Sequence, residues 1–375
     1  MNFDYTDDQK SLKEEARRFL AAASPLTVAR GVLEAPDAGY DTGLWARIAE
    51  QGWCGATIPE AYGGLGLGYV ELCALAEELG RAVAPVPFAS SIYFFAEGVL
   101  LAGNEEQKST LLPLVSAGEL IGTLAVSEGP GALTGARIAA KVTAGKLSGT
   151  KLPVADGMAA GLAIVLAQSE SGLGLFLADL SDASVTRAPV STIDPTRGSA
   201  RIVFDATPVT PLGEAGKGFE TLARIQDRGA ILLAFEQLGG ADRCLEMARD
   251  YALERYAFGR PIGSYQAIKH KLADVFVKNE VARANAYYGA WALSTDADEL
   301  PVAAAAARVA GCAAYWLAAK EMIQTHGGIG VTWEADCHFF YRRARHLGLV
   351  IGAPRDWKRR LADGLEARVN AENAA

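Results

Sequence analysis

The spacing of hydrophobic and polar positions changes twice along this chain. Up to about Ile121, apolar residues recur at helical spacing, and the first such run places four of them on one helical face: Leu12, Ala16, Phe19 and Leu20. Thr6 and Gln9 stand three residues apart just before this run, which is the pattern of a capping box at a helix start. The pattern predicts three helices in this part of the chain: 6–22, 70–81 and 105–117.

The next part of the chain favours strands. Short segments rich in Val, Leu and Ile are separated by Gly, Ser or Asp, which is typical of an antiparallel sheet. The predicted strands cover 146–150, 161–168, 174–180, 184–190 and 200–205. Two prolines and three glycines between Thr207 and Phe219 predict a segment without regular structure that ends this region.

Long stretches rich in Ala, Leu, Glu and Arg then predict helices over 219–254, 262–295, 300–326 and 335–370. The order of the chain is therefore helical, then β, then helical. The predicted fold class is α+β, with three domains: an N-terminal helical domain (1–120), a middle antiparallel β domain (121–215) and a C-terminal helical bundle domain (216–375).

Composition narrows the class of protein. Of the 375 residues, 50% are hydrophobic and 21% charged, as in ordinary globular proteins, and the net charge of −8 disfavours nonspecific binding to nucleic acid or anionic membranes. The N-terminal residues lack the pattern of a secretion signal, and no uncharged apolar run of about 18 residues is found. We therefore expect a cytoplasmic protein without a membrane span.

Cysteine and histidine usage points the same way. The five cysteines are odd in number and show no CxxC spacing, so we expect reduced cysteines. The spacing of His326, His338 and His346 with Cys337 is not that of metal ligands, and no metal site is expected.

Two segments contain candidate ligand-binding residues. The first is Arg-Tyr-Ala-Phe-Gly-Arg-Pro-Ile at 255–262, and the second is Gln-Thr-His-Gly-Gly-Ile-Gly at 324–330. Arg255 offers a forked cationic donor that suits a diphosphate, and Gly327 and Gly328 permit close approach of a ligand to the backbone. Taken alone, the same residues also allow a surface cation at a helix end and a simple turn.

Both segments resemble cofactor-contacting segments of the FAD-dependent acyl-CoA dehydrogenase family. Further segments extend the resemblance in family order: PEAYGGLG at 59–66, EELGR at 77–81, GNEEQK at 103–108 and LGEAGKGF at 212–219. The resemblance implies a C-terminal four-helix bundle and assembly into dimers or dimers of dimers. It also implies dehydrogenation between the alpha and beta carbons of an acyl-CoA thioester, with electrons passed to an electron-transfer flavoprotein.

The resemblance also implies roles for particular residues. In the family, Arg and Phe at the positions of Arg255 and Phe258 reach across a subunit interface to the ADP half of FAD bound mainly by the neighbouring chain. The expected FAD contacts of this chain are Arg255, Phe258, Gln266, Gln324, Gly327, Gly328 and, towards the flavin ring, Ser127.

The chain departs from the family at the flavin ring. Pro153 stands where the family has an aromatic residue that packs on the ring, and Ala155 stands where it has a Thr that bonds the ring edge. Neither residue can replace those contacts.

The catalytic Glu of the family is also absent from both of its usual positions, which here hold Ile351 and Gly229. Asp227 would face away from Gly229 on a helix, and Glu236 would lie about 10 Å along the helix axis. Both are interpreted as solvated or salt-bridged carboxylates, so no catalytic residue is assigned.

The expected contacts to the ADP half of FAD are kept, whereas the expected contacts to the flavin ring are lost. This combination suggests the non-catalytic subunit of a heteromeric acyl-CoA dehydrogenase. Its expected partners are a sister subunit and a bulky acyl-CoA, such as one with a steroid side chain. Two alternatives stay open: an active homomer with an unusual base and flavin pocket, and a flavin-free structural or CoA-binding relative.

Overall fold

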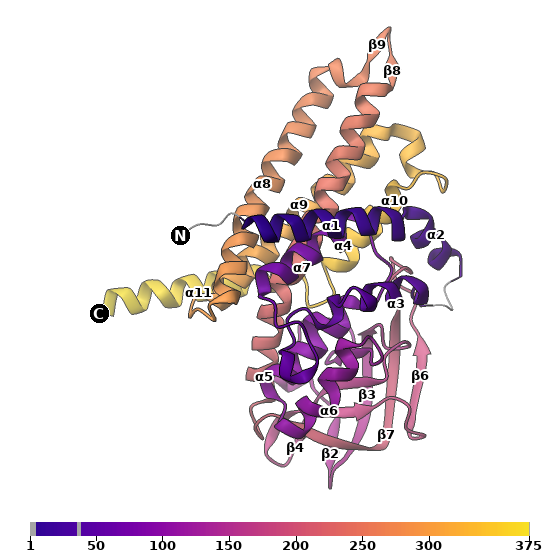
Figure 1. Ribbon diagram of the computed structural model, residues 1–375. Helices are drawn as coiled ribbons and strands as arrows, with labels where there is room; N and C mark the ends of the chain where they lie inside the picture. The colour runs from indigo at the N-terminus through magenta and orange to yellow at the C-terminus, as the bar shows by residue number, and fades with distance from the viewer. Residues whose placement is uncertain (1–4, 36–38, 375) are drawn as a thin grey trace. The chain divides into compact units, whose positions relative to one another are not determined.

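The computed structural model describes residues 5–35 and 39–374 and has the predicted order of helical, β and helical regions (Figure 1). The α-helices are α1 (Asp7–Ala23), α2 (Leu26–Glu34), α3 (Thr42–Glu50), α4 (Tyr69–Arg81), α5 (Glu97–Ala102), α6 (Glu105–Ser116), α7 (Gly218–Glu254), α8 (Gln266–Ser294), α9 (Leu300–His326), α10 (Cys337–Leu347) and α11 (Pro354–Ala374). The strands are β1 (Gly122–Ala125), β2 (Lys141–Thr143), β3 (Lys146–Ala155), β4 (Leu162–Ser169), β5 (Gly172–Asp179), β6 (Val185–Pro189), β7 (Ser199–Leu212), β8 (Tyr256–Ala257) and β9 (Arg260–Pro261). The α+β fold class, with a β region between two helical regions, is confirmed.

The contacts within the chain group it into two compact units. The first unit holds the residues up to Ala29, Tyr69–Ala84, and everything from Ala230 onwards. The second unit holds Arg30–Gly68 and Pro85–Gly229, so the division falls inside α7. The domain boundaries near 120 and 215 stay predictions from the sequence.

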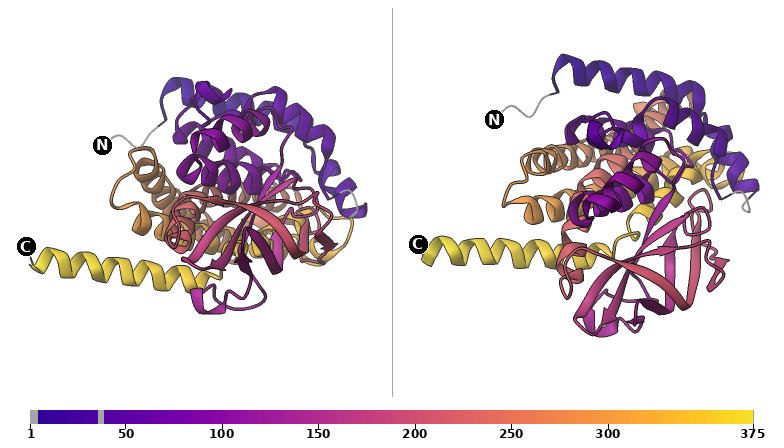
Figure 2. Two further views of the ribbon diagram at one scale, coloured as in Figure 1. Left: turned by 90° about the horizontal axis from the view of Figure 1, so that it is seen from below. Right: turned by 60° about the horizontal axis from the view of Figure 1, so that its bottom comes forward.

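The second unit is built on a seven-stranded sheet (Figure 2). Hydrogen bonds join β4 to β2, β2 to β3, β3 to β7, β7 to β5 and β5 back to β4, which makes a closed ring of pairings. The pairing is antiparallel except where β1 and β2 meet β4 in parallel. Residues 163–167 of β4 are all buried, as expected for a strand covered on both faces.

The segment that follows the predicted strands differs from the sequence-based expectation. Residues 207–212 were predicted to be irregular, but β7 continues through Pro208 and Pro211. The first part of this extension pairs with β3 and the last part with β5, so each proline has a neighbouring strand on one side. Proline is tolerated there because an N–H that points away from the neighbour is not needed.

The predicted helix 335–370 is wrong as a single element. It is divided into α10 and α11, because Gly352 has a φ of 103° and Pro354 begins the second helix. The indole N–H of Trp357 donates to the backbone oxygen of Ile351 at 3.0 Å, which fixes the turn between the two helices. Similarly, α8 begins at Gln266 rather than at residue 262.

The first unit packs α4 closely against α7. The capping box predicted at Thr6 and Gln9 is present at the start of α1. Where α4 meets α7, a Cβ added to Gly80 would lie 1.8 Å from the backbone oxygen of Glu236. Glycine at this position therefore sets how near the two helix backbones come.

We expect Gly80→Ala to lower the free energy of unfolding by about 3 kcal/mol or more, because the added methyl group forces two helix backbones apart. Gly31→Ala in α2 is the matched control, since its Cβ would meet nothing within 4 Å. That change should stabilise the chain by about 0.5–1 kcal/mol. Urea denaturation of both variants measures the difference, and equal effects would contradict this packing.

One helix among the described residues is long and apolar enough to cross a membrane, which the sequence reading did not identify. It covers Leu300–Val331, within which a window of 18 residues has a mean hydropathy of 1.4, and 61% of that window is buried inside the protein. The charge of Arg308 interrupts the run, but its side chain is buried and donates to the side chain of Gln237 and the backbone oxygen of Leu347. All five cysteines are buried and free, as expected.

Candidate functional site

A two-residue hairpin connects α7 to α8 (Figure 1). Strands β8 and β9 pair antiparallel, and Phe258 and Gly259 form the loop with φ values of 51° and 80°. This left-handed pair suits a type I′ turn, in which Asn or Gly usually takes the first place. Phe258 is 97% exposed. A large apolar side chain kept in solvent at a strained position is typical of a residue that contacts another molecule.

Arg255 lies at the base of the hairpin. Its N–H donates to the backbone oxygen of Tyr251, and its own backbone oxygen accepts from Ile262, each at 2.8 Å. Its exposed side chain forms no hydrogen bond or ion pair with another described residue. By contrast, the guanidinium of Arg260 lies over the ring of Tyr265 at 4.0 Å. The Arg255 guanidinium is therefore available to an external anion.

Gln266 is the first residue of α8 and is exposed. The hydroxyl of the preceding Tyr265 donates to the backbone oxygen of Ala257 at 2.9 Å, which holds the start of α8 against the hairpin. The first N–H groups of a helix lack partners within the helix, and the helix dipole favours negative charge there.

The second predicted segment lies at the end of α9. Gln324 is exposed in the last turn, and Gly327 ends the helix with φ 65° and ψ −140°, a conformation that favours glycine. A Cβ added to Gly327 or Gly328 would meet nothing within 4 Å, so both leave their backbone open to a ligand. Gly330 differs, because its Cβ would lie 2.6 Å from the backbone oxygen of Ile323.

A ring stack brings the two segments together. The rings of Tyr251 and His326 lie 4.2 Å apart at 24°, which joins the last turns of α7 and α9. Tyr251 is one turn before Arg255, and His326 directly precedes Gly327. The structure therefore places the Arg255 and Gly327 segments at the same end of the first unit.

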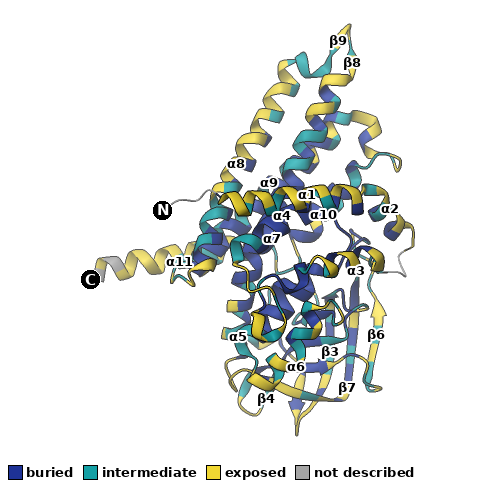
Figure 3. Cartoon of the chain, viewed as in Figure 1, coloured by how far each residue is buried: buried dark blue, intermediate teal, exposed yellow. Residues whose placement is uncertain are grey.

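Exposed apolar side chains surround these segments. We call them the apolar surface: Leu253, Tyr256, Phe258, Ile329, Val331 and Trp333. Part of the apolar surface lies on the hairpin, much of which is exposed (Figure 3). Several large apolar side chains near one another in solvent are a mark of a protein–protein interface.

We expect Phe258→Asn to raise the free energy of unfolding of the isolated chain by about 1 kcal/mol, because Asn tolerates the left-handed backbone better than Phe. The same change should weaken assembly with a second chain, since a large aromatic contact is lost. Phe219→Asn is the control, because Phe219 is also exposed but lies in helical backbone. Thermal unfolding and analytical ultracentrifugation test both effects. Destabilisation of the isolated chain by Phe258→Asn would contradict this view of the hairpin.

Ser127 belongs to the second unit and follows β1. Its hydroxyl donates to the backbone oxygen of Gly129 at 3.2 Å, and its backbone oxygen accepts from the N–H of Leu152 at 2.8 Å. The next residue, Glu128, accepts from Lys151 at 2.7 Å. Burial lowers the pKa of the Lys151 ammonium, and the contact with Glu128 opposes this shift. This buried pair fixes the loop that carries Ser127.

Pro153 and Ala155, which stand where residues that contact the flavin ring were expected, lie on β3. Pro153 is exposed and sits at an irregularity of the β3–β7 pairing, between Lys151 and Val154. Ala155 is half-buried and pairs with Ser199. Pro153 presents no aromatic face, and Ala155 presents no hydroxyl.

The two positions expected for a catalytic Glu, Gly229 and Ile351, hold no carboxylate, and the acidic residues near Gly229 in the sequence are buried. A Cβ at Gly229 would lie 2.2 Å from the ring of Phe94. Ile351 is half-buried in the turn fixed by Trp357. Glu236 is buried, and its carboxylate lies 3.6 Å from the equally buried guanidinium of Arg343. Asp227 is buried as well.

Sequence reasoning missed the residues that join and surround the two segments. Tyr251 and His326 are far apart in the sequence, and nothing in their spacing predicts a stack. Tyr256 and Val331 could have been suspected because large apolar residues stand next to polar motif positions.

Two models of one protein family match this chain. Residues 6–119 match the family model described as "Acyl-CoA dehydrogenase, N-terminal domain", and residues 216–354 match "Acyl-CoA dehydrogenase, C-terminal domain". The chain is 34% identical over 359 residues to "Acyl-CoA dehydrogenase IpdE2" of Mycobacterium tuberculosis, covering 95% of this chain and 96% of the relative.

Solved structures are also similar to this chain over almost its whole length. A variant of the "Tcur3481-Tcur3483 steroid ACAD" has a TM-score of 0.88 at 30% identity, over 97% of this chain and 99% of that one. Butyryl-CoA dehydrogenase from Megasphaera elsdenii has a TM-score of 0.88 at 25% identity, over 97% of this chain and 100% of that one.

Proposed function

This chain belongs to the acyl-CoA dehydrogenase family, and we propose that it is the non-catalytic subunit of an FAD-dependent enzyme of this family. In this proposal its hairpin and the end of α9 bind the ADP half of an FAD whose ring is held by a sister chain. When bound, the flavin accepts the hydride, and the residues of this chain position its nucleotide end.

The observation that carries the proposal is the Arg255 side chain, which is exposed and forms no hydrogen bond or ion pair with the described residues. A diphosphate is a good partner for it, because a guanidinium donates two parallel hydrogen bonds to phosphate oxygens. Gly327 and Gly328 leave backbone open for close approach, and the start of α8 at Gln266 favours an anion. Phe258 and Gln324 would complete the contacts from exposed positions.

The flavin ring fits this chain poorly. The chain offers Pro153 and Ala155 in place of an aromatic face and a hydroxyl, whereas Ser127 keeps its hydroxyl. A ring bound here would lose both a stacking surface and a hydrogen bond to its edge. This supports a ring held by another chain.

The active-homomer alternative requires a base from this chain. A base must reach the proton that it removes, and it needs a carboxylate that is free to accept that proton. The Glu236 carboxylate lies beside the Arg343 guanidinium in the core of the first unit, which suits a structural ion pair better than a base.

The proposed substrate is an acyl-CoA thioester with a bulky acyl group. The name of one structural relative describes it as a steroid ACAD and joins two components. We propose the same substrate class and a two-component assembly for this chain, with electron-transfer flavoprotein as the electron acceptor and the cytoplasm as its location.

Counting FAD in the assembled enzyme tests the proposal. This chain should be co-expressed with a relative from the same genome that has Glu where this chain has Ile351. We expect a stable complex that holds about half as many FAD molecules as chains. One FAD for every chain would contradict the proposal, because this chain would then seat its own flavin.

A further inference from the structure

Helix α8 carries apolar residues on two opposite sides. The inner side is buried in the first unit and includes Val275, Ala282, Ala286, Ala290 and Leu293. The other side holds four exposed residues spaced for one helical face, which we call the outer row: Ala273, Val277, Val281 and Ala284. A helix that is apolar on both sides is normally covered on both. We propose that the outer row is an interface, at which α8 packs antiparallel against α8 of a second copy of this chain.

The exposure of large apolar side chains is concentrated on this part of α8. Val277 is 59% exposed and Val281 48%, and Phe276 at the edge of the outer row is 54% exposed. Much of α8 is exposed in the single chain (Figure 3). One exposed apolar residue is ordinary, whereas several that adjoin one another on a helix indicate an interaction site.

The spacing of the outer row suits another helix as the partner. Its members follow one another after four, four and three residues, as in the contact line of two helices that pack side by side. Ala273 and Ala284 at its ends are small, which allows the two helices to approach closely.

Two charged residues beside the outer row are left without partners. Asp274 and Lys278 are exposed on the same flank of the row, four positions apart. Neither side chain forms a hydrogen bond or an ion pair with another described residue. By contrast, Glu280 on the other flank pairs with Arg283 at 3.2 Å. The unpaired acid and base are therefore available to a base and an acid of another molecule.

A second copy of the chain offers those charges in the right places. Two antiparallel helices related by a two-fold axis bring the same flank of each copy together. With the axis beside Phe276, Asp274 of each copy lies level with Lys278 of the other, which makes two ion pairs, and the two Phe276 rings meet on the opposite flank. A parallel pair would bring the charged flank against Phe276. Antiparallel packing therefore matches charge with charge and ring with ring.

The interface goes beyond the proposed function and leaves the FAD contacts free. The outer row begins seven residues after Gln266, which is about 10 Å along the helix, and includes no residue of the hairpin 255–261. One copy can therefore use the hairpin for a sister chain and the outer row for its own kind. The expected enzyme contains two copies of this chain and two sister chains.

Sedimentation equilibrium of the full chain tests the charges beside the outer row. Asp274→Lys should weaken self-association by at least about tenfold, because two attractive pairs become repulsive. Asp363→Lys is the matched control, since Asp363 is exposed on α11 and the change in charge is the same. Equal affinities of the two variants, or an unchanged chain that stays monomeric, would overturn the proposal.

Exchange of the two charges tests whether the partner is a second copy. The double variant Asp274→Lys with Lys278→Asp should regain the self-association that Asp274→Lys loses, because both ion pairs form again with their signs exchanged. If the outer row instead binds the sister chain, the exchange leaves the repulsion in place and assembly is not regained. That outcome would show that the occupant proposed here is wrong.

Cross-linking through a new cysteine tests the apolar contact. All five natural cysteines are buried, so few disulfides between chains are expected from them. Under a mild oxidant, Val277→Cys should give a disulfide-linked dimer. Val369→Cys on α11 is the control, because Val369 is a valine of similar exposure, 54% against 59%. An equal yield of linked dimer from both variants would contradict the interface.

Discussion

Arg255→Ala is expected to weaken FAD retention by the two-chain enzyme by about tenfold to a hundredfold. The exposed guanidinium has no hydrogen bond or ion pair within the described chain, so its interaction energy is available to the cofactor. Hydrogen bonds to a charged group contribute about 1.5–3 kcal/mol, which corresponds to this range of affinity. The dissociation constant of FAD, measured by fluorescence titration of the apo complex, reports the change.

Arg249→Ala is the control for this experiment. Arg249 lies near the end of α7, six residues before Arg255, is exposed, and forms an ion pair with Asp250. The two variants should have equal melting temperatures without FAD and different FAD affinities. Unchanged FAD affinity in the Arg255 variant would show that the hairpin does not take part in cofactor binding, even if the fold is correct.

Glu236→Ala is expected to lower the free energy of unfolding by about 3–5 kcal/mol. The change removes a carboxylate that lies 3.6 Å from the buried Arg343 guanidinium, and breaking a buried ion pair leaves an uncompensated charge. Urea denaturation of the isolated chain measures this loss. Glu220→Ala on the same helix is the control, since Glu220 is exposed and its loss should change stability by no more than about 0.5 kcal/mol.

The Glu236→Ala variant also distinguishes the proposed non-catalytic subunit from an active homomeric enzyme. In the complex with the sister chain, kcat should be unchanged at a temperature where the variant stays folded. If Glu236 were the base, kcat of the folded variant would fall by orders of magnitude. A large loss of kcat at a temperature where the variant stays folded would therefore favour the homomeric enzyme.

Much of the fold could be predicted from local patterns. Thr6 and Gln9 identify the start of α1, the apolar spacing identifies α4 and α6, and the composition rich in Ala, Leu, Glu and Arg identifies α7 and α9. The prediction of irregular structure at the prolines of β7 was wrong. Whether a strand tolerates a proline depends on which side of the strand has a neighbour. That information lies in the pairing of strands far apart in the sequence.

The candidate site could be predicted only as separate segments. Family order indicated Arg255 and Gly327, but only the structure shows that Tyr251 and His326 stack and so join the two segments. The exposure of Phe258 agrees with the contact to another chain that the resemblance implies, whereas its apolar character taken alone would suggest a core residue. The assignment of these residues to FAD stays a prediction that the experiments above test.

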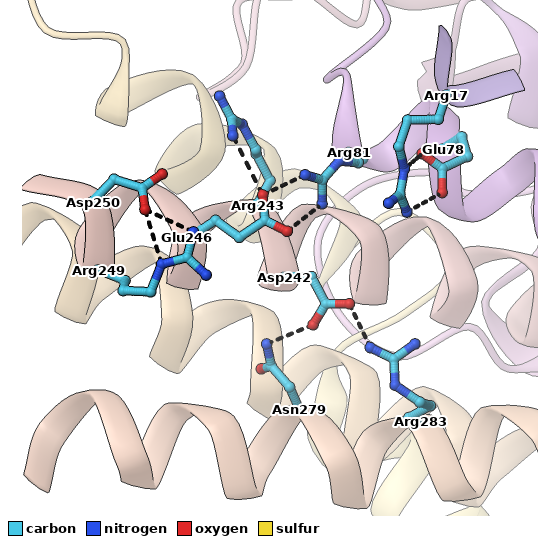
Figure 4. A network of polar contacts seen from close by, with 10 residues as sticks. All are labelled: Arg17, Glu78, Arg81, Asp242, Arg243, Glu246, Arg249, Asp250, Asn279 and Arg283. Atoms are coloured by element: carbon cyan, nitrogen blue, oxygen red, sulfur yellow. Dashed lines mark hydrogen bonds and ion pairs between the residues drawn. The ribbon is translucent and has the colours of Figure 1, made fainter. Parts of the chain in front are cut away.

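The charged network of the first unit had no sequence signal at all. Arg17, Arg81 and Arg243 are widely separated in the sequence. They come together because α1 and α7 pack against α4, which brings their side chains next to Glu78 and Glu246 (Figure 4).

The visible absorption spectrum of this chain purified alone tests the central claim most directly. If the chain binds only the nucleotide end of a flavin, it should be colourless when expressed by itself and become yellow only when purified together with the sister chain. A yellow homomer whose colour is bleached by an acyl-CoA thioester would contradict the account, because this chain would then both seat the ring and supply the base.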